Sequence, residues 1–305
     1  MKTNNRYFIN NSSDYEKMWR LTRENYNKTG NRATWVFARL EDWKYNLYSE
    51  NKRFPDFHEE SAVLWFSDFG DLLGFVINED GDSYVNIITK VGYNHLFQEI
   101  LNWTIKNWAP KYSGIETNAV EDQVHEIKAL KNTGFKDAGW CELSREYLLK
   151  DVTAQENSLP DGYSIVDMVE NSNWESKQKL YISAFQNREE LNSYDMKTMK
   201  YWMKTTSFNP YLHLSVIDKE GNHVSTCYAF TDFDNSMAEI EKVCTLKEQR
   251  NKGLAQSVIK ECFNRLYKLG IKKAYITGIS DEAKATYGKV GISSSKEVIN
   301  FKLEI

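Results

Sequence analysis

Residues 243–266, VCTLKEQRNKGLAQSVIKECFNRL, place a glycine and two basic side chains at the start of an amphipathic helix pattern. The first N–H groups of a helix have no acceptor within it, and the helix dipole leaves partial positive charge there. A phosphate fits such a position, and Gly253 would let it approach the backbone closely. Arg250 and Lys252 add positive charge. The pattern predicts a phosphate site; a solvated loop before a helix is the alternative.

Two carboxylates precede this stretch on a strand-like segment. Glu239 and Glu241 are two residues apart, so a strand would direct both to one side. A carboxylate in a closing cleft can have its pKa raised and act as a general base. The alternative is that both are exposed strand residues. Cys244 could in principle carry an acyl group, but its apolar strand indicates a buried thiol.

The elements that must position these residues alternate between strand and helix patterns. In the second half, period-two or apolar runs predict strands at 163–169, 212–217, 224–231, 238–245, 273–277 and 298–303. Helical spacing predicts helices at 174–185, 196–205 and 281–290, and one that begins after Gly253 and stops at Gly270. The first half has weaker signals, with strands at 62–66, 72–78 and 84–89 and a helix at 95–108. This alternation predicts an α/β or α+β fold around a mixed sheet.

The motif Arg250-x-x-Gly253-x-Ala255 resembles the (Q/R)-x-x-G-x-(G/A) signature of the GCN5-related N-acetyltransferases, the GNAT superfamily. The strand A-E-I-E-K-V-C-T precedes it, and T-Y-G-K-V-G-I near residue 290 resembles the family element A-x-x-L-Y-x-x-x-G-F. The resemblance covers most of 163–305. It implies a mixed, mostly antiparallel, twisted sheet flanked by helices, and acetyl-CoA as co-substrate.

The resemblance also implies roles for individual residues. Backbone amides of the loop would hold the pyrophosphate of acetyl-CoA, from residues Arg250, Asn251, Lys252, Gly253, Leu254, Ala255 and Gln256. The strand end Val243, Cys244 and Thr245 would separate from its neighbour and pair with the pantetheine arm. Ser280 falls where the family often has an asparagine that touches the cofactor, and this departure leaves its role in doubt.

The resemblance assigns Tyr287 to the proton donor for the leaving thiolate, with a packed aromatic as the alternative. Glu239 matches the catalytic glutamate of the histone-acetylating members, and Glu241 or a water chain is the other candidate base. The reaction would be direct transfer in a ternary complex, which replaces much of the entropy cost of bringing two molecules together.

The two halves of the chain look like copies of one layout. Gly291 and Gly134 lie 157 residues apart, and Tyr163 and Tyr7 lie 156 apart. We expect a first domain at 1–150, a linker at 151–161 and an acetyl-CoA-binding domain at 162–305. The first half keeps Gly92 but has no basic loop, and Leu130 stands where Tyr287 would be. It is therefore predicted to be a degenerate copy in a tandem protein.

Composition excludes several function classes. A net charge of -4 argues against nucleic-acid binding and slightly favours a cationic acceptor. The five histidines lack metal-ligand spacing, so no metal is expected. No apolar run is long enough to span a membrane, and the polar N-terminus MKTNNRYFINN predicts no secretory leader.

The remaining expectations concern partners and location. The four cysteines form no C-x-x-C pair and fit reduced thiols in the cytoplasm. The leading function is an N-acetyltransferase acting on a small-molecule amine, as a monomer or homodimer. The alternatives are transfer to a protein or peptide amine, a non-catalytic acyl-CoA sensor, and tRNA-dependent aminoacyl transfer, which would need a basic face.

Overall fold

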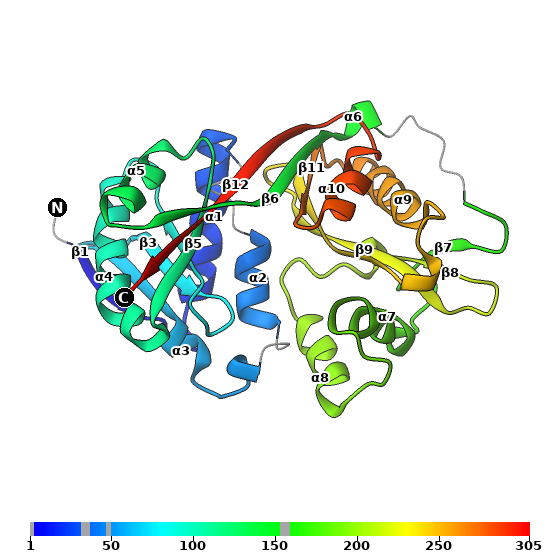
Figure 1. The fold of residues 1–305 in the computed structure, drawn as a ribbon, viewed down its shortest axis with the longest axis horizontal. Helices are drawn as coiled ribbons and strands as arrows, with labels where there is room; N and C mark the ends of the chain where they lie inside the picture. The colour runs from blue at the N-terminus through cyan, green and yellow to red at the C-terminus, as the bar shows by residue number, and fades with distance from the viewer. Residues whose placement is uncertain (1–2, 32–36, 47–49, 153–158) are drawn as a thin grey trace. The chain divides into compact units, whose positions relative to one another are not determined.

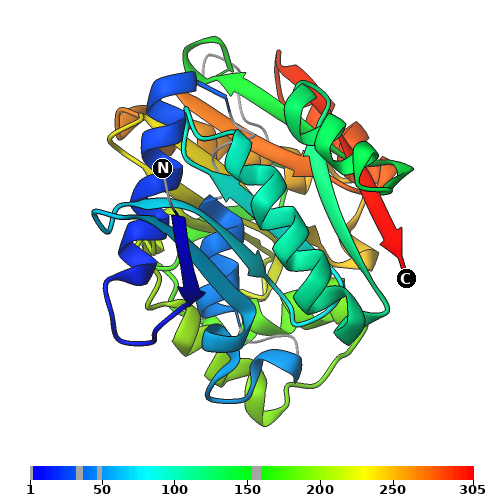
Figure 2. The ribbon, with the colours of Figure 1, turned by 90° about the vertical axis from the view of Figure 1, so that its left-hand side faces the viewer.

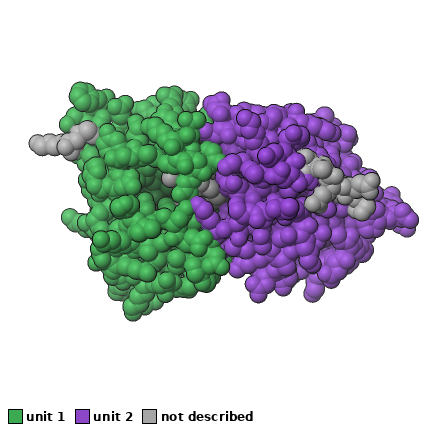
Figure 3. Space-filling model, turned by 90° about the horizontal axis from the view of Figure 1, so that it is seen from above, with its two compact units in different colours: residues 1–141, 297–305 green, residues 142–296 purple. Residues whose placement is uncertain are grey.

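The computed structural model describes residues 3–31, 37–46, 50–152 and 159–305. The chain forms two compact units, coloured separately in Figure 3: unit 1 comprises residues 1–141 and 297–305, and unit 2 comprises residues 142–296. These units differ from the expected division at 1–150 and 162–305 because two strands, β6 (Lys136–Leu148) and β12 (Ser294–Glu304), contribute to both units. Most of the expected linker 151–161 lies outside the described residues; residues 151 and 152 end α6 (Leu149–Val152).

Unit 1 contains an antiparallel sheet of four strands in the order β1-β2-β3-β4. These strands are β1 (Thr3–Tyr7), β2 (Ala62–Ser67), β3 (Leu72–Asn78) and β4 (Val85–Thr89). In addition, β5 (Gly114–Val120) pairs antiparallel with β12, from Val298 opposite Val120 to Glu304 opposite Gly114. The last strand of the chain therefore completes unit 1.

Helices cover both faces of the sheet in unit 1. The long helix α4 (His95–Tyr112) lies over one face (Figure 2), and its Leu96, Ile100 and Leu101 belong to the hydrophobic core on that side. The other face packs against α1 and α2. The helices and short turns of this unit are α1 (Asp14–Thr29), α2 (Phe37–Tyr45), η2 (Glu50–Lys52), α3 (Phe57–Ser61) and α5 (Val124–Asn132). Alternation along β2 and β3 supplies apolar side chains to both faces.

The strands of unit 2 follow the order β6-β11-β10-β9-β8-β7. They are β7 (Ser164–Asp167), β8 (His213–Ile217), β9 (His223–Asp232), β10 (Met237–Thr245) and β11 (Lys273–Gly278). Neighbours β10 and β11 are parallel, whereas β6 with β11, β10 with β9, β9 with β8 and β8 with β7 are antiparallel. Unit 2 is thus a mixed, mostly antiparallel sheet, and the predicted fold class is confirmed.

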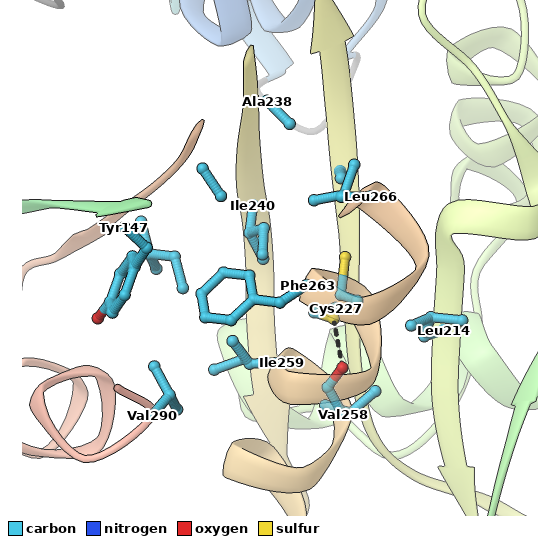
Figure 4. Packing of buried hydrophobic residues seen from close by; sticks show 14 of the residues in the cluster. Tyr147, Leu214, Cys227, Ala238, Ile240, Val258, Ile259, Phe263, Leu266 and Val290 are labelled. Carbon is cyan, nitrogen blue, oxygen red and sulfur yellow. Dashed lines mark hydrogen bonds between the residues drawn. The ribbon is translucent and has the colours of Figure 1, made fainter. Parts of the chain in front are cut away.

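The helices of unit 2 also lie on two faces (Figure 1). They are α7 (Trp174–Gln186), α8 (Ser193–Trp202), α9 (Leu254–Lys268) and α10 (Asp281–Gly288), with the short turns η3 (Pro210–Leu212) and η4 (Lys247–Gln249). Figure 4 shows Val258, Ile259 and Phe263 of α9 packed against β9 and β10. Cys227 faces α9, and its neighbour Tyr228 packs on Trp202 of α8, because adjacent strand residues point to opposite faces.

Both halves of the chain repeat one order of elements, β-α-α-β-β-β-α-β-α-β, apart from the added η2 and α3 in the first half and short turns. This agrees with the predicted duplication. The predicted strands and helices of the second half are present within a few residues of their expected ends. The sequence did not predict α5, β5 or the long strand β6 of the first half. None of the described helices is long and apolar enough to cross a membrane.

Candidate active site

A cleft opens in unit 2 where two parallel strands separate. The β10–β11 ladder ends at the pair Ile240 and Ile276, but β10 continues to Thr245. The cleft has a volume of ≈ 920 Å³ and is lined by the end of β10, the loop before α9, and α10. The sequence predicted this separation, and it leaves the edge of β10 without a strand partner on that side. An extended ligand can add to such an edge.

The loop before α9 presents backbone amides to the cleft. No backbone N–H group of residues 251–256 makes a hydrogen bond of normal geometry within the described part of the chain. Gly253 caps α9 in the left-handed conformation, with φ of 76°, and a Cβ built there has no neighbour within 4 Å. The loop therefore presents a row of backbone N–H donors at the start of a helix, and Gly253 has no side chain to cover them. This arrangement binds phosphate.

The two basic side chains of this loop differ in direction. Arg250 lines the cleft, and its Nε donates to the backbone oxygen of Thr245 at 3.3 Å. Lys252 does not line the cleft: its Nζ donates to the Tyr163 hydroxyl at 2.8 Å and to Gln249 Oε1 at 2.7 Å. Lys252 thus supports the loop from outside.

A β-bulge shapes the end of β10. The register with β9 shifts between Glu241, opposite Tyr228, and Cys244, opposite Thr226, so two residues of β10, Lys242 and Val243, face the single residue Cys227 of β9. Lys242 adopts a left-handed backbone conformation with φ of 48°. The bulge interrupts the regular ladder and bends β10 at the point where the two parallel strands separate.

The structure separates the two candidate bases. Glu241 lines the cleft, whereas Glu239 lies deeper on the same strand, is only 3% exposed and does not line it. Glu239 lies opposite Phe230 of β9 and Tyr275 of β11, inside the part of the sheet that is still fully paired. A small ligand in the cleft would meet Glu241 first.

Tyr287 of α10 lines the cleft and is 7% exposed. Burial raises the pKa of its phenol strongly, and the negative charge of Glu241 raises it further. This electrostatic coupling places Glu241 and Tyr287 in one neighbourhood. The backbone oxygen of Tyr287 accepts a 2.6 Å hydrogen bond from the hydroxyl of Tyr147 on β6, which anchors α10 to the sheet.

Two other predicted residues have clear structural settings. Cys244 lines the cleft, and burial raises the pKa of its thiol to about 12, so it remains protonated and is a poor nucleophile. Ser280 also lines the cleft, but its Oγ accepts from the backbone N–H of Ala283 at 3.2 Å and caps α10. The cleft also gathers the predicted residues Val243, Thr245, Asn251, Gly253, Leu254, Ala255 and Gln256.

Several lining residues were not predicted from the sequence. Ala184 and Phe185 come from the end of α7, far upstream of the motif, and Ile279 follows β11. Lys242 was passed over because a regular strand would have turned it away from Glu241. Within the described ranges no group of histidine, cysteine or acidic residues could hold a metal ion.

The family comparison points to the same part of the chain. Residues 169–292 match the model of the acetyltransferase (GNAT) family. No curated protein sequence gives a significant match.

Solved structures share the fold of the whole chain at low identity. A GCN5-related N-acetyltransferase from Sphaerobacter thermophilus is 14% identical, with 99% of this chain and 95% of that chain covered and a TM-score of 0.65. A tandem GNAT protein from the clavulanic acid biosynthesis pathway is 12% identical, with coverage of 99% and 98% and a TM-score of 0.65. An acetyltransferase from Colwellia psychrerythraea is 11% identical over 100% of both chains, with a TM-score of 0.58. Residues 169–292, which contain the open loop and the separated strands, therefore form a domain of the GNAT family of acetyltransferases, and the whole chain shares its fold with a tandem GNAT protein.

Proposed function

We propose that unit 2 binds acetyl-CoA in this cleft and transfers its acetyl group to the primary amine of a small molecule. Acetyl transfer is the activity of the family. The observation that carries the proposal is the row of unbonded amides at residues 251–256, at one end of a cleft that also contains Glu241 and Tyr287.

The residues present suit each part of acetyl-CoA. The loop amides around Gly253 and the charge of Arg250 fit the diphosphate. The edge of β10 at Val243–Thr245 fits the amides of the pantetheine arm, which would extend the sheet as an added strand. When bound, acetyl-CoA supplies the activated acyl group.

Glu241 accepts the proton of the acceptor ammonium, directly or through a water, and so generates the nucleophilic amine. Its place in the cleft favours it over Glu239, which lies within the paired part of the sheet. The amine nitrogen forms a bond to the acyl carbon while the carbon–sulfur bond breaks. The nitrogen then loses its second proton to water as the amide forms, and the Tyr287 phenolate left after protonation of the thiolate regains a proton from water. Holding both reactants in one cleft removes much of the entropy barrier.

The β10 bulge and Tyr287 stabilise the charges that develop. Backbone N–H groups on the end of β10 beyond Ile240, where the β10–β11 ladder stops, polarise the acyl oxygen. Tyr287 donates its proton to the departing thiolate. Because the charge of Glu241 helps to raise the pKa of Tyr287, protonation of Glu241 lowers that pKa and makes the phenol a better acid. Proton uptake by Glu241 from the amine therefore favours proton donation by Tyr287 to the thiolate.

The test combines binding and turnover. Calorimetric titration with acetyl-CoA should give one site per chain, and chromatography should show CoA release when small primary amines are added. Binding without release on small amines or peptides would support the acyl-CoA sensor instead. Release with lysine-containing peptides alone would make this a protein or peptide acetyltransferase. Absence of binding would overturn the proposal.

The four free thiols fit a cytoplasmic location, which fractionation of cells would test.

A further inference from the structure

Two neighbouring residues of opposite charge line the cleft together. Glu241 and Lys242 follow one another on β10, and a regular strand would direct them to opposite faces of the sheet. The bulge removes this alternation, since the register shifts after Glu241 and Lys242 has φ of 48°. The bulge therefore brings an acidic and a basic residue to one cleft.

The conformation of Lys242 is unfavourable for this residue type. Left-handed backbone is tolerated by glycine, and by asparagine and aspartate, whose short side chains bond locally. Lysine has neither property. A strained residue that persists at the edge of a candidate active site points to a function for that residue.

Lys242 lies at the end of the cleft away from the diphosphate loop. Its Nζ is 5.7 Å from the centre of the Trp202 ring of α8, and Trp202 is 5% exposed. Arg250 instead contacts Thr245, at the far end of the same strand segment. The indole face thus stabilises the ammonium of Lys242 through a cation–π contact.

We propose that the acceptor is an amine that also carries an acid group, as an amino acid does, with its nitrogen at Glu241 and its carboxylate at Lys242. This inference rests on the proposed function and names its substrate class. A paired carboxylate and ammonium on adjacent residues complement the two charges of such a zwitterion. The net charge of -4 suggested a cationic acceptor, but charges inside the cleft act at shorter range than the net charge.

The first experiment compares matched acceptors on the unaltered protein. The pairs are phenylalanine with phenethylamine, ornithine with putrescine, and lysine with cadaverine, each differing by one carboxylate. We expect kcat/KM to be at least about 10-fold higher for the acid-bearing member of at least one pair. Equal or better turnover of the decarboxylated member in all three pairs would overturn the inference and leave the proposed function intact.

The second experiment uses Lys242→Met, which keeps length and an unbranched Cβ, so the backbone strain is unchanged. It should lower kcat/KM for the preferred acid-bearing amine by about 10- to 100-fold and change that of its decarboxylated partner by less than about 3-fold. Lys242→Arg should retain most of the preference. Lys219→Met, in the exposed β8–β9 turn, is the matched control for lost charge and should change neither rate.

The outcomes separate the two proposals. Equal loss on both members of a pair, with unchanged acetyl-CoA affinity, would mean that Lys242 only shapes the bulge, and the zwitterion inference would fall. If calorimetry shows acetyl-CoA binding but no amine or amino acid of the panel releases CoA, the proposed transfer to small amines fails together with the inference. A selective loss confined to the acid-bearing amines would support both.

Discussion

The two helix starts that follow β4 and β10 have the same position in the repeated fold but differ in their hydrogen bonds. Before α4, the N–H of Val91 donates to Asn25 Oδ1 at 2.9 Å and that of Tyr93 to the oxygen of Lys90 at 2.9 Å. Before α9, residues 251–256 have no such acceptors in the part of the chain that is described. A repeated fold can thus keep a helix start while closing the donors that make it a phosphate site.

Asn25 is the side chain that closes the first helix start. It is 1% exposed on α1, and its Nδ2 also donates to the backbone oxygen of Thr89 at 2.8 Å. The side-chain amide of Asn25 therefore bonds one backbone acceptor, the oxygen of Thr89, and one backbone donor, the N–H of Val91, at the end of β4. We propose that unit 1 does not bind acetyl-CoA because this closure adds to the missing basic loop, so that removing Asn25 alone does not create a site. Leu130, which stands where Tyr287 would be, is fully buried in the apolar core and supplies no proton.

The sharpest test of this comparison uses a matched pair of glycines. Gly253 and Gly92 both have positive φ, 76° and 91°, and an added Cβ meets nothing within 4 Å at either place. Gly253→Asp should weaken acetyl-CoA binding by about 100-fold through charge and bulk at the diphosphate, about 2.7 kcal/mol. Gly92→Asp carries the same backbone strain and should leave calorimetric affinity unchanged. Equal losses would contradict the assignment of the site to unit 2.

Tyr287→Phe should lower kcat by about 100-fold, because the ring still packs but the acid is lost. Acetyl-CoA affinity should not change, and parallel loss of binding would contradict the role. Tyr147→Phe is the control. It removes the hydrogen bond to the Tyr287 backbone, so it should reduce the free energy of unfolding by about 1 kcal/mol and change kcat much less.

Glu241→Gln should lower kcat by about 30-fold and remove the rise of kcat/KM with pH on the acid side. That rise exists because a base must be deprotonated to act. The loss of its negative charge should also lower the pKa of Tyr287, in the direction opposite to the present shift. Glu239→Gln should retain the rise of kcat/KM with pH on the acid side. If the Glu239 variant alone loses this rise, the base is Glu239, which lies deeper in the sheet than the cleft.

Arg250→Ala and Lys252→Ala compare two basic residues of one loop, of which Arg250 lines the cleft and Lys252 lies outside it. Removing Arg250 from the cleft should weaken acetyl-CoA binding by about 10-fold. Removing Lys252, which bonds Tyr163 and Gln249 outside the cleft, should cost about 2-fold. Titration calorimetry at two salt concentrations measures both effects. A larger loss for Lys252 would show that this side chain turns inward when the cofactor binds.

Asn25→Ala should have the smallest effect on cofactor binding and a clear effect on stability. It removes the hydrogen bonds of Asn25 to the part-buried oxygen of Thr89 and N–H of Val91, which costs about 2 kcal/mol in the free energy of unfolding by urea titration. Acetyl-CoA stoichiometry should stay at one per chain. A stoichiometry of two would show that this one side chain is what closes the site in unit 1.

The sequence predicted much of the candidate site because its signals are local. The glycine before α9, the amphipathic spacing of α9 and the strand before it all lie within about 30 residues. Lys252 shows the limit of such signals: the motif places its charge at the diphosphate, but Tyr163, distant in the sequence, holds it outside. Phe185 had no signal at all, because α7 reaches the cleft only through packing.

By itself, then, the sequence determined the order of the elements in the second half, the duplication and the helix start after Gly253, since short-range periodicity and backbone freedom specify these features. The tertiary structure alone decided three others. The pairing of β12 with β5 assigns the last residues to unit 1, the bulge brings Lys242 to the same cleft as Glu241, and Asn25 closes the other helix start. Each depends on a long-range contact or a local break in strand alternation, and a linear pattern of residues records neither.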